Sequence, residues 1–139
     1  MNLASIPVNQ VSDETTPIHE SMDAEGLNLD VENVRIKGRV EFRGHLERVD
    51  ERLSVGMHTE GIQTLTCARC LENFDRPFKK QMMFTVDIQG KMTINLLPLL
   101  REEIVVEYPI RALCGEDCKG FCPSCGANLN QGPCRCPTR

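Results

Sequence analysis

The chain has 139 residues, of which 40% are hydrophobic and 26% are charged, and this size and composition suit one globular domain with a modest core. No apolar run approaches the roughly 18 residues that a membrane span needs, and the N-terminus lacks the basic start and apolar stretch of a signal peptide. We therefore expect a cytoplasmic protein without a membrane partner, and the composition excludes secreted disulfide scaffolds, transporters and large cofactor enzymes.

The net charge of −4 is distributed unevenly along the chain. Residues 1–33 carry seven acidic residues and no Lys or Arg, whereas residues 34–139 carry sixteen basic and thirteen acidic residues. We expect 1–33 to be an acidic, partly mobile segment, with an edge strand over residues 1–9 and a loop over about 10–30. A mildly basic remainder is compatible with a nucleic-acid partner.

A strict alternation of side chains begins at Val34 and predicts a half-buried antiparallel strand. One side is apolar or small: Val34, Ile36, Gly38, Val40 and Phe42. The other side is charged: Arg35, Lys37, Arg39, Glu41 and Arg43. A second strand is predicted over 53–57. After it, Glu60-Gly61 either turns the chain or marks a bulge before residues 62–66.

The segment 77–88 alternates again, with one apolar face that only Lys80 interrupts. Asn95 is suited to cap a short helix over 96–103, and Pro98 is tolerated in its first turn. The β-branched run 104–106 favours a return to extended structure. Residues 34–110 are therefore predicted to form a β-rich core, and the fold class is α+β with mostly antiparallel strands and one short helix.

Eight cysteines are the unusual feature of the composition, and they fall into four pairs. The pairs are Cys67 with Cys70, Cys114 with Cys118, Cys122 with Cys125, and Cys134 with Cys136. In a reducing compartment, pairs at such spacing usually hold metal, and zinc takes four thiolates in a tetrahedron. We therefore expect two zinc ions and a zinc-binding tail over 111–139, in which the metal supports structure.

The four pairs can be combined into two sites in three ways. We favour one site made of Cys122, Cys125, Cys134 and Cys136, because it closes a compact knuckle. Cys67, Cys70, Cys114 and Cys118 would then form the other site and fasten the tail to the end of a strand. A catalytic zinc is disfavoured because such a site usually needs an open position and His or carboxylate ligands. The three histidines, His19, His45 and His58, are expected to be ordinary surface residues.

Redox chemistry is an alternative interpretation of a C-x-x-C pair. A reactive pair normally lies at a helix N-terminus, where the helix dipole lowers the thiol pKa. Cys67 instead follows the strand-like residues 64–66, and no helical apolar period follows Cys70. A thiol redox protein is therefore our third hypothesis.

Three segments of the chain carry a resemblance to a known family. They are Leu65-Thr66-Cys67-Ala68-Arg69-Cys70-Leu71-Glu72, the stretch Glu103-Ile104-Val105-Val106-Glu107-Tyr108-Pro109, and the run from Cys114 to Asn130 followed by Cys134-Arg135-Cys136. Together they resemble the YceD family, the large ribosomal RNA subunit accumulation proteins. The resemblance implies a non-enzymatic factor that helps large-subunit (23S) rRNA accumulate during ribosome assembly. It implies a precursor rRNA or a ribosomal protein as partner, and neither a small-molecule substrate nor a catalytic residue.

Basic residues on the first predicted strand and in the tail are candidate nucleic-acid contacts. They are Arg35, Lys37, Arg39, Arg43, Lys119 and Arg135. Such a stripe can contact phosphates without reading sequence, although a solvated outer sheet face offset by nearby acids is the favoured interpretation. We expect no aromatic stacking platform, because the few Phe fall mainly on apolar faces. A zinc-dependent protein-interaction adaptor unconnected with ribosomes is the second hypothesis.

Overall fold

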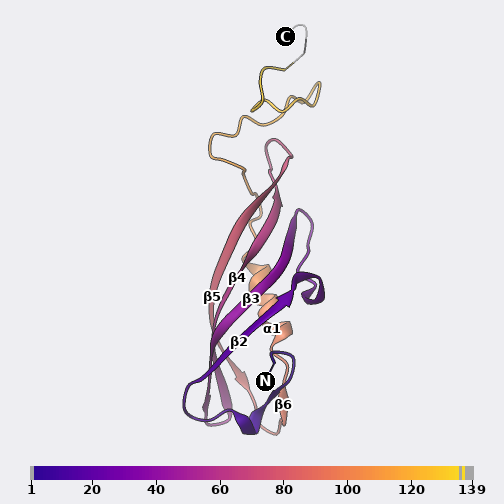
Figure 1. The fold of residues 1–139 in the computed structure, drawn as a ribbon. Helices are drawn as coiled ribbons and strands as arrows, with labels where there is room; N and C mark the ends of the chain where they lie inside the picture. The colour runs from indigo at the N-terminus through magenta and orange to yellow at the C-terminus, as the bar shows by residue number, and fades with distance from the viewer. Residues whose placement is uncertain (1, 135, 137–139) are drawn as a thin grey trace.

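The computed structural model describes residues 2–134 and 136, and its centre is a long antiparallel sheet with strand order β2-β3-β4-β5 (Figure 1). The strands are β2 (Thr16–Asp23), β3 (Val34–Val49), β4 (Arg52–Thr66) and β5 (Asn73–Asp87). Two short strands, β1 (Ile6–Pro7) and β6 (Thr93–Ile94), pair separately. The 3-10 helices η1 (Val8–Gln10) and η2 (Ala24–Leu27) and the helix α1 (Leu97–Val106) complete the fold. The predicted α+β class is confirmed.

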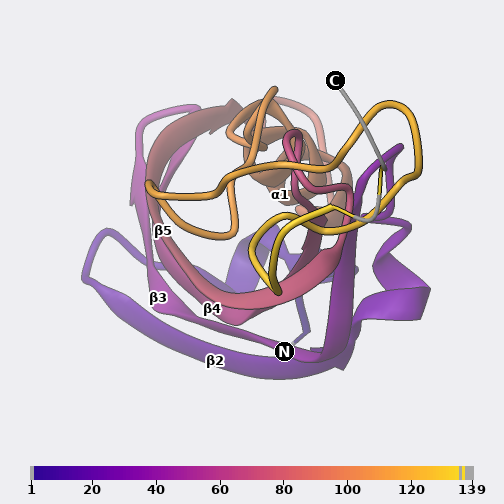
Figure 2. The ribbon, with the colours of Figure 1, turned by 90° about the horizontal axis from the view of Figure 1, so that it is seen from above.

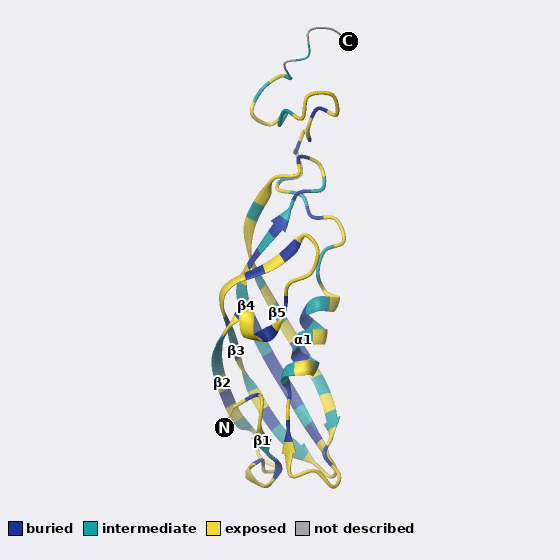
Figure 3. Cartoon of the chain, turned by 90° about the vertical axis from the view of Figure 1, so that its right-hand side faces the viewer, coloured by how far each residue is buried: buried dark blue, intermediate teal, exposed yellow. Residues whose placement is uncertain are grey.

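The sheet curves around α1, so that one face of every long strand is turned toward the helix (Figure 2). Buried residues recur along the strands and on α1 (Figure 3), and those of the sheet and the helix belong to one core cluster. The alternation predicted from Val34 is confirmed, because Val34, Ile36, Val40 and Phe42 are buried while the basic residues between them are exposed. Burial of aliphatic side chains on one face is what holds such a sheet against its helix.

A β-bulge lies where Glu60-Gly61 left two interpretations open. The register between β3 and β4 shifts between Lys37 and Glu41, while β4 continues unbroken through Gly61 and stays paired with β5. The turn interpretation is therefore wrong, and the extra residues are in β3. Gly38 takes a φ of 72° there, a conformation that glycine adopts without a steric cost.

The N-terminal segment differs from the prediction of a loop over about 10–30, which is wrong for β2. Residues 16–23 pair with β3 along their whole length, and Ile18 is buried. Leu27 and Leu29 are also buried, in the same core as the sheet. The apolar residues here are too few and too irregular to give a period. They are ordered because they pack into the main core and remove its apolar side chains from water. Of the predicted edge strand over 1–9, the structure forms only β1.

The helix begins close to the predicted position and continues further than predicted. The backbone N–H of Leu97 donates to the side-chain oxygen of Asn95 at 3.0 Å, so Asn95 stabilises the helix start. The prediction of extended structure over 104–106 is wrong, because α1 extends to Val106. Ile104 is 2% exposed and packs into the core, and this packing outweighs the weak helix propensity of β-branched residues. Within the described part of the chain, no helix is both long and apolar enough to span a membrane.

Candidate metal centres

The eight cysteines gather into two groups of four. We call Cys67, Cys70, Cys114 and Cys118 the proximal cysteine group, and Cys122, Cys125, Cys134 and Cys136 the distal cysteine group. In each group all four sulfur atoms lie within 4.8 Å of one another. This grouping is the one that the spacing favoured. Both groups lie in or beside the C-terminal segment, which projects past the ends of β4 and β5 (Figure 1).

The proximal cysteine group joins the tail to the end of the sheet. Cys67 directly follows β4 and is fully buried, and a tight turn brings Cys70 to its side through the bond from Leu71 N–H to the Cys67 carbonyl (2.9 Å). The tail runs past this turn, where the Ala68 N–H donates to the Ala112 carbonyl at 2.8 Å. The Sγ atoms are 3.6 Å apart for Cys67 and Cys118, and 3.8 Å apart for Cys70 and Cys114.

The distal cysteine group is built by a local turn. The Gly126 N–H donates to the Cys122 carbonyl at 2.8 Å, and the Cys122 N–H donates to the Ala127 carbonyl at 2.9 Å. Gly126 has a φ of 75°, so the turn uses the left-handed conformation that glycine favours. The Cys122 side chain is buried, and its Sγ lies 3.6 Å from that of Cys136.

These distances fit zinc and do not fit disulfides. Four sulfurs bound tetrahedrally at about 2.3 Å from zinc lie roughly 3.8 Å from one another, whereas disulfide sulfurs are separated by about 2.05 Å. None of the eight cysteines forms a disulfide. No histidine belongs to either group; His19 and His58 instead pair with Glu41 and Glu60 on the outer face of the sheet, at 2.9 and 2.8 Å.

The electrostatics of the two groups favour a bound cation. Burial disfavours the Cys67 thiolate, but backbone N–H groups of Cys70, Cys114 and Arg69 donate to it, and its pKa falls to about 6. The N–H groups of Cys125 and Ser124 likewise lower the pKa of Cys122 to about 6. In contrast, the neighbouring sulfurs of Cys122 and Cys125 raise the pKa of Cys136 to about 12. In the proximal cysteine group the Asn130 side chain also lowers the pKa of Cys118. Neither group lowers the pKa of all four of its thiols, so a bound metal ion would hold the four thiolates together.

The five described basic residues that were predicted to contact nucleic acid are exposed, but two of them already have acidic partners. Lys37 Nζ lies 3.1 Å from Asp75 Oδ2, and Arg39 lies 3.6 Å from Asp23 while also donating to the Ser21 carbonyl. Arg35 lines a polar pocket, and Arg43 is the cross-strand neighbour of His19 in β2 and of His58 in β4. Lys119 lies between the two cysteine groups in sequence, and Arg135 lies outside the described residues.

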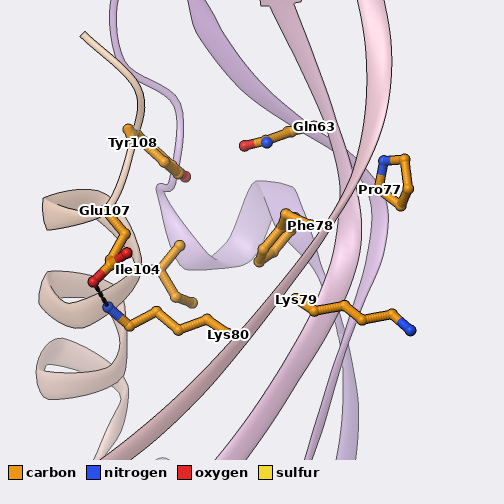
Figure 4. A pocket seen from close by; sticks show the side chains of 8 residues that line it. All are labelled: Gln63, Pro77, Phe78, Lys79, Lys80, Ile104, Glu107 and Tyr108. Carbon is orange, nitrogen blue, oxygen red and sulfur yellow. Dashed lines mark ion pairs between the residues drawn. The ribbon is translucent and has the colours of Figure 1, made fainter.

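A cleft between β5 and α1 was not predicted. Its volume is about 260 Å³, and it is lined by Gln63, Pro77, Phe78, Lys79, Lys80, Ile104, Glu107 and Tyr108 (Figure 4). The only sign of it in the sequence is Lys80, which interrupts the apolar face of β5. Its ammonium group lies 3.0 Å from Glu107 and 3.9 Å from Glu103, with its side chain 13% exposed.

Comparison with known proteins assigns the family. The family described as "Large ribosomal RNA subunit accumulation protein YceD" matches residues 55–139. The chain is 30% identical over 131 residues to an uncharacterized protein, YlbN, of Bacillus subtilis (strain 168), an alignment that covers 82% of this chain and 71% of that protein.

A second relative is the Arabidopsis thaliana chloroplastic protein named "Large ribosomal RNA subunit accumulation protein YCED homolog 1". It is 42% identical over 43 residues, which are 31% of this chain and only 13% of that protein. No solved structure matches the chain. The family match includes every cysteine of both groups, and the chain belongs to the YceD family of large ribosomal RNA subunit accumulation proteins.

Proposed function

We propose that this protein is a non-enzymatic assembly factor that promotes the accumulation of large-subunit rRNA. The observation that carries the proposal is the family match over 55–139, which covers β4, β5, α1 and both cysteine groups. The family is named for rRNA accumulation and not for a reaction. The partner is a precursor of large-subunit rRNA or a ribosomal protein bound to it, and the protein works in the cytoplasm.

Zinc has a structural role in this proposal. The proximal and distal cysteine groups each hold one ion, and the metal keeps four thiolates together in a tail whose hydrogen bonds are mostly local. With every cysteine of both groups used as a ligand, no thiol remains for redox chemistry. RNA contact through the exposed basic residues Arg35, Lys37, Arg39, Arg43 and Lys119 is part of the proposal; the ion pairs of Lys37 and Arg39 reduce their share.

The test is the ratio of large- to small-subunit rRNA after deletion of the gene in its own host. We expect the ratio to fall, and the intact gene to restore it. An unchanged ratio with normal subunit profiles would contradict the assembly role and leave the adaptor hypothesis in first place. Co-sedimentation with large-subunit precursors distinguishes the two hypotheses independently, because an adaptor unconnected with ribosomes stays at the top of the gradient.

Replacement of one distal ligand links this role to zinc. Cys122→Ser removes the most buried thiol of the distal cysteine group, and we expect the zinc content of the purified protein to fall from two ions per chain to one. The variant should fail to restore the rRNA ratio. Ser124→Ala is the matched control, because Ser124 lies in the same turn, two residues after Cys122, and is exposed; this variant should retain both ions. Full zinc content in Cys122→Ser would show that the distal cysteine group is not a metal site.

A further inference from the structure

The cleft between β5 and α1 has the chemistry of a site for one flat, polar-edged group. Phe78 forms its middle, Gln63 and Tyr108 face each other at one end, and the Lys80–Glu107 ion pair closes the other end (Figure 4). Ile104 adds an apolar wall from α1. Pro77 and Lys79 point away from this space (Figure 4).

Gln63 is a nearly buried polar residue whose side chain has no hydrogen-bond partner among the described residues. The residue is only 8% exposed, it lines the cleft, and among the described residues its side-chain amide makes no hydrogen bond. A nearly buried amide carries both a donor and an acceptor, and it is costly to leave unpaired. The Tyr108 hydroxyl donates to the Leu29 carbonyl at 2.8 Å, which leaves its oxygen lone pairs free to accept.

The cleft is suited to a neutral group and not to a phosphate. The charge of Lys80 is already balanced by Glu107 and Glu103. The volume of the cleft, about 260 Å³, is below the 300–1,000 Å³ of pockets that hold drug-sized ligands, so the cleft has room for a single ring system. Gly61 lies directly opposite Phe78, and because it has no Cβ, the Phe78 ring can lie flat over it.

A positively charged side chain, that of Arg76, lies next to the cleft. Arg76 is the cross-strand neighbour of Gln63, is exposed, and has no acidic partner among the described residues. Its guanidinium lies 5.7 Å from the centre of the Phe74 ring. Every second residue of a strand lies on the same face, so one face of β5 carries an alternation of aromatic and basic residues: Phe74, Arg76, Phe78 and Lys80. Single-stranded RNA is bound by this combination of stacking rings and cations.

We infer that this cleft receives one unstacked nucleobase of single-stranded RNA. The base stacks on Phe78, its polar edge pairs with the Gln63 amide and the Tyr108 oxygen, and Arg76 contacts the adjoining phosphate. The inference rests on the proposed function, because it names the part of the rRNA that the protein reads.

The experiment compares two RNA oligonucleotides of about ten nucleotides, a length within the span of known single-strand sites. One is intact and the other carries abasic sugars at every position, so that both present the same phosphates but only the first presents bases. We expect the full-length, zinc-loaded protein to bind the intact RNA about tenfold more tightly, as expected for one stacked base. On titration, the side-chain NH₂ resonances of Gln63 should shift in the ¹H–¹⁵N spectrum.

Variants assign the effect to the cleft. Gln63→Leu and Phe78→Leu should each bring the ratio of intact to abasic affinity close to one, while Gln81→Leu, on the outer face of β5, should leave it unchanged. Arg76→Gln should weaken both oligonucleotides alike. Thermal unfolding curves check that each variant folds, and the comparison on the unaltered protein needs no variant.

Equal affinity of the unaltered protein for both RNAs would overturn the inference while leaving phosphate-mediated rRNA binding intact. A preference for intact RNA that survives both cleft variants would also overturn it. Binding of neither RNA would overturn it as well and point to a protein partner; the rRNA ratio in the deletion strain then decides the proposed function separately.

Discussion

Tyr108 connects two distant parts of the chain through one hydrogen bond. Its hydroxyl reaches the carbonyl of Leu29, and its ring packs on Val34, Leu65 and Ala112 as well as on the main core. Tyr108 is also the only tyrosine, and the chain has no tryptophan. Its ultraviolet absorbance therefore reports on this place alone.

The ionisation of Tyr108 should be shifted to high pH. Burial disfavours the phenolate, and the nearby Asp30 charge adds to this, so the pKa rises to about 12 from 10. Because the folded-state pKa is raised, this contribution to stability is complete below pH 10 and is lost as the pH rises toward 12. Absorbance titration at 295 nm measures the value directly. A phenolate band appearing at pH 10 in folded protein would contradict the burial of the ring.

The prolines within strands show how single residues fit their position in the sheet. Pro17 lies in β2 and Pro77 lies in β5, and these are the two edge strands. An edge position is where a strand tolerates a residue without an N–H. Proline and the inward-pointing charge of Lys80 also make the β5 edge a poor template for pairing with another chain.

At the scale of elements, the docking of α1 depends on a short apolar stripe. Ile104 is buried in the last part of the helix, while Val106, two residues later, is 74% exposed. We expect Ile104→Ala to lower the free energy of unfolding by about 2–4 kcal/mol, because it leaves a cavity under the helix. Val106→Ala is the matched control and should change it by less than about 0.5 kcal/mol. Urea denaturation followed by circular dichroism measures both, and equal effects would show that Ile104 does not pack into the core.

The strands could be predicted from the sequence because their signal is local. A period of two with one buried face is visible at Val34–Phe42 and again around Phe84, whatever the strands pair with. The distal cysteine group could also be predicted, since its ligands lie within one short loop, and the proximal cysteine group followed as the two remaining pairs; that these residues bind zinc stays a prediction. Three features could not be predicted, because each depends on contacts between segments far apart in sequence: the last turn of α1, the strand β2 and the cleft at Gln63.

At the scale of the whole molecule, the N-terminal segment is part of the core. Leu3 and Ile6 are fully buried, and Leu29 is 1% exposed. Each such side chain contributes roughly 1.5–3 kcal/mol on burial, and a domain has only about 5–15 kcal/mol of stability in total.

Deletion of residues 2–33 should therefore abolish cooperative thermal unfolding. The expected melt is a broad, sloping change in circular dichroism without a transition. Neutralising the exposed pair Asp13 and Glu14 by Asp13→Asn and Glu14→Gln is the control, and it should leave the transition in place. A truncated chain that still unfolds cooperatively would restore the interpretation of this segment as a solvated acidic tail.

Metal removal should affect only one end of the molecule. The main core contains none of the cysteines, whereas three buried cysteines, Cys67, Cys70 and Cys118, form a small cluster of their own at the end of the sheet. With a strong chelator, we expect resonances from about residue 111 onward to lose their dispersion in ¹H–¹⁵N spectra while the strand signal in circular dichroism remains. Unchanged tail spectra after verified metal loss would show that zinc does not order this segment.

The two cysteine groups differ in how far along the chain their ligands are separated. Cys122 and Cys136 are 14 positions apart, while Cys67 and Cys118 are 51 positions apart with β5 and α1 between them. Closing a short loop is fast and needs no other structure, whereas the long loop closes only once the sheet and helix have formed. In the proposed zinc-bound protein, the distal site therefore needs only its local turn to take up an ion, whereas the proximal site captures its ion only when the sheet and the helix have formed.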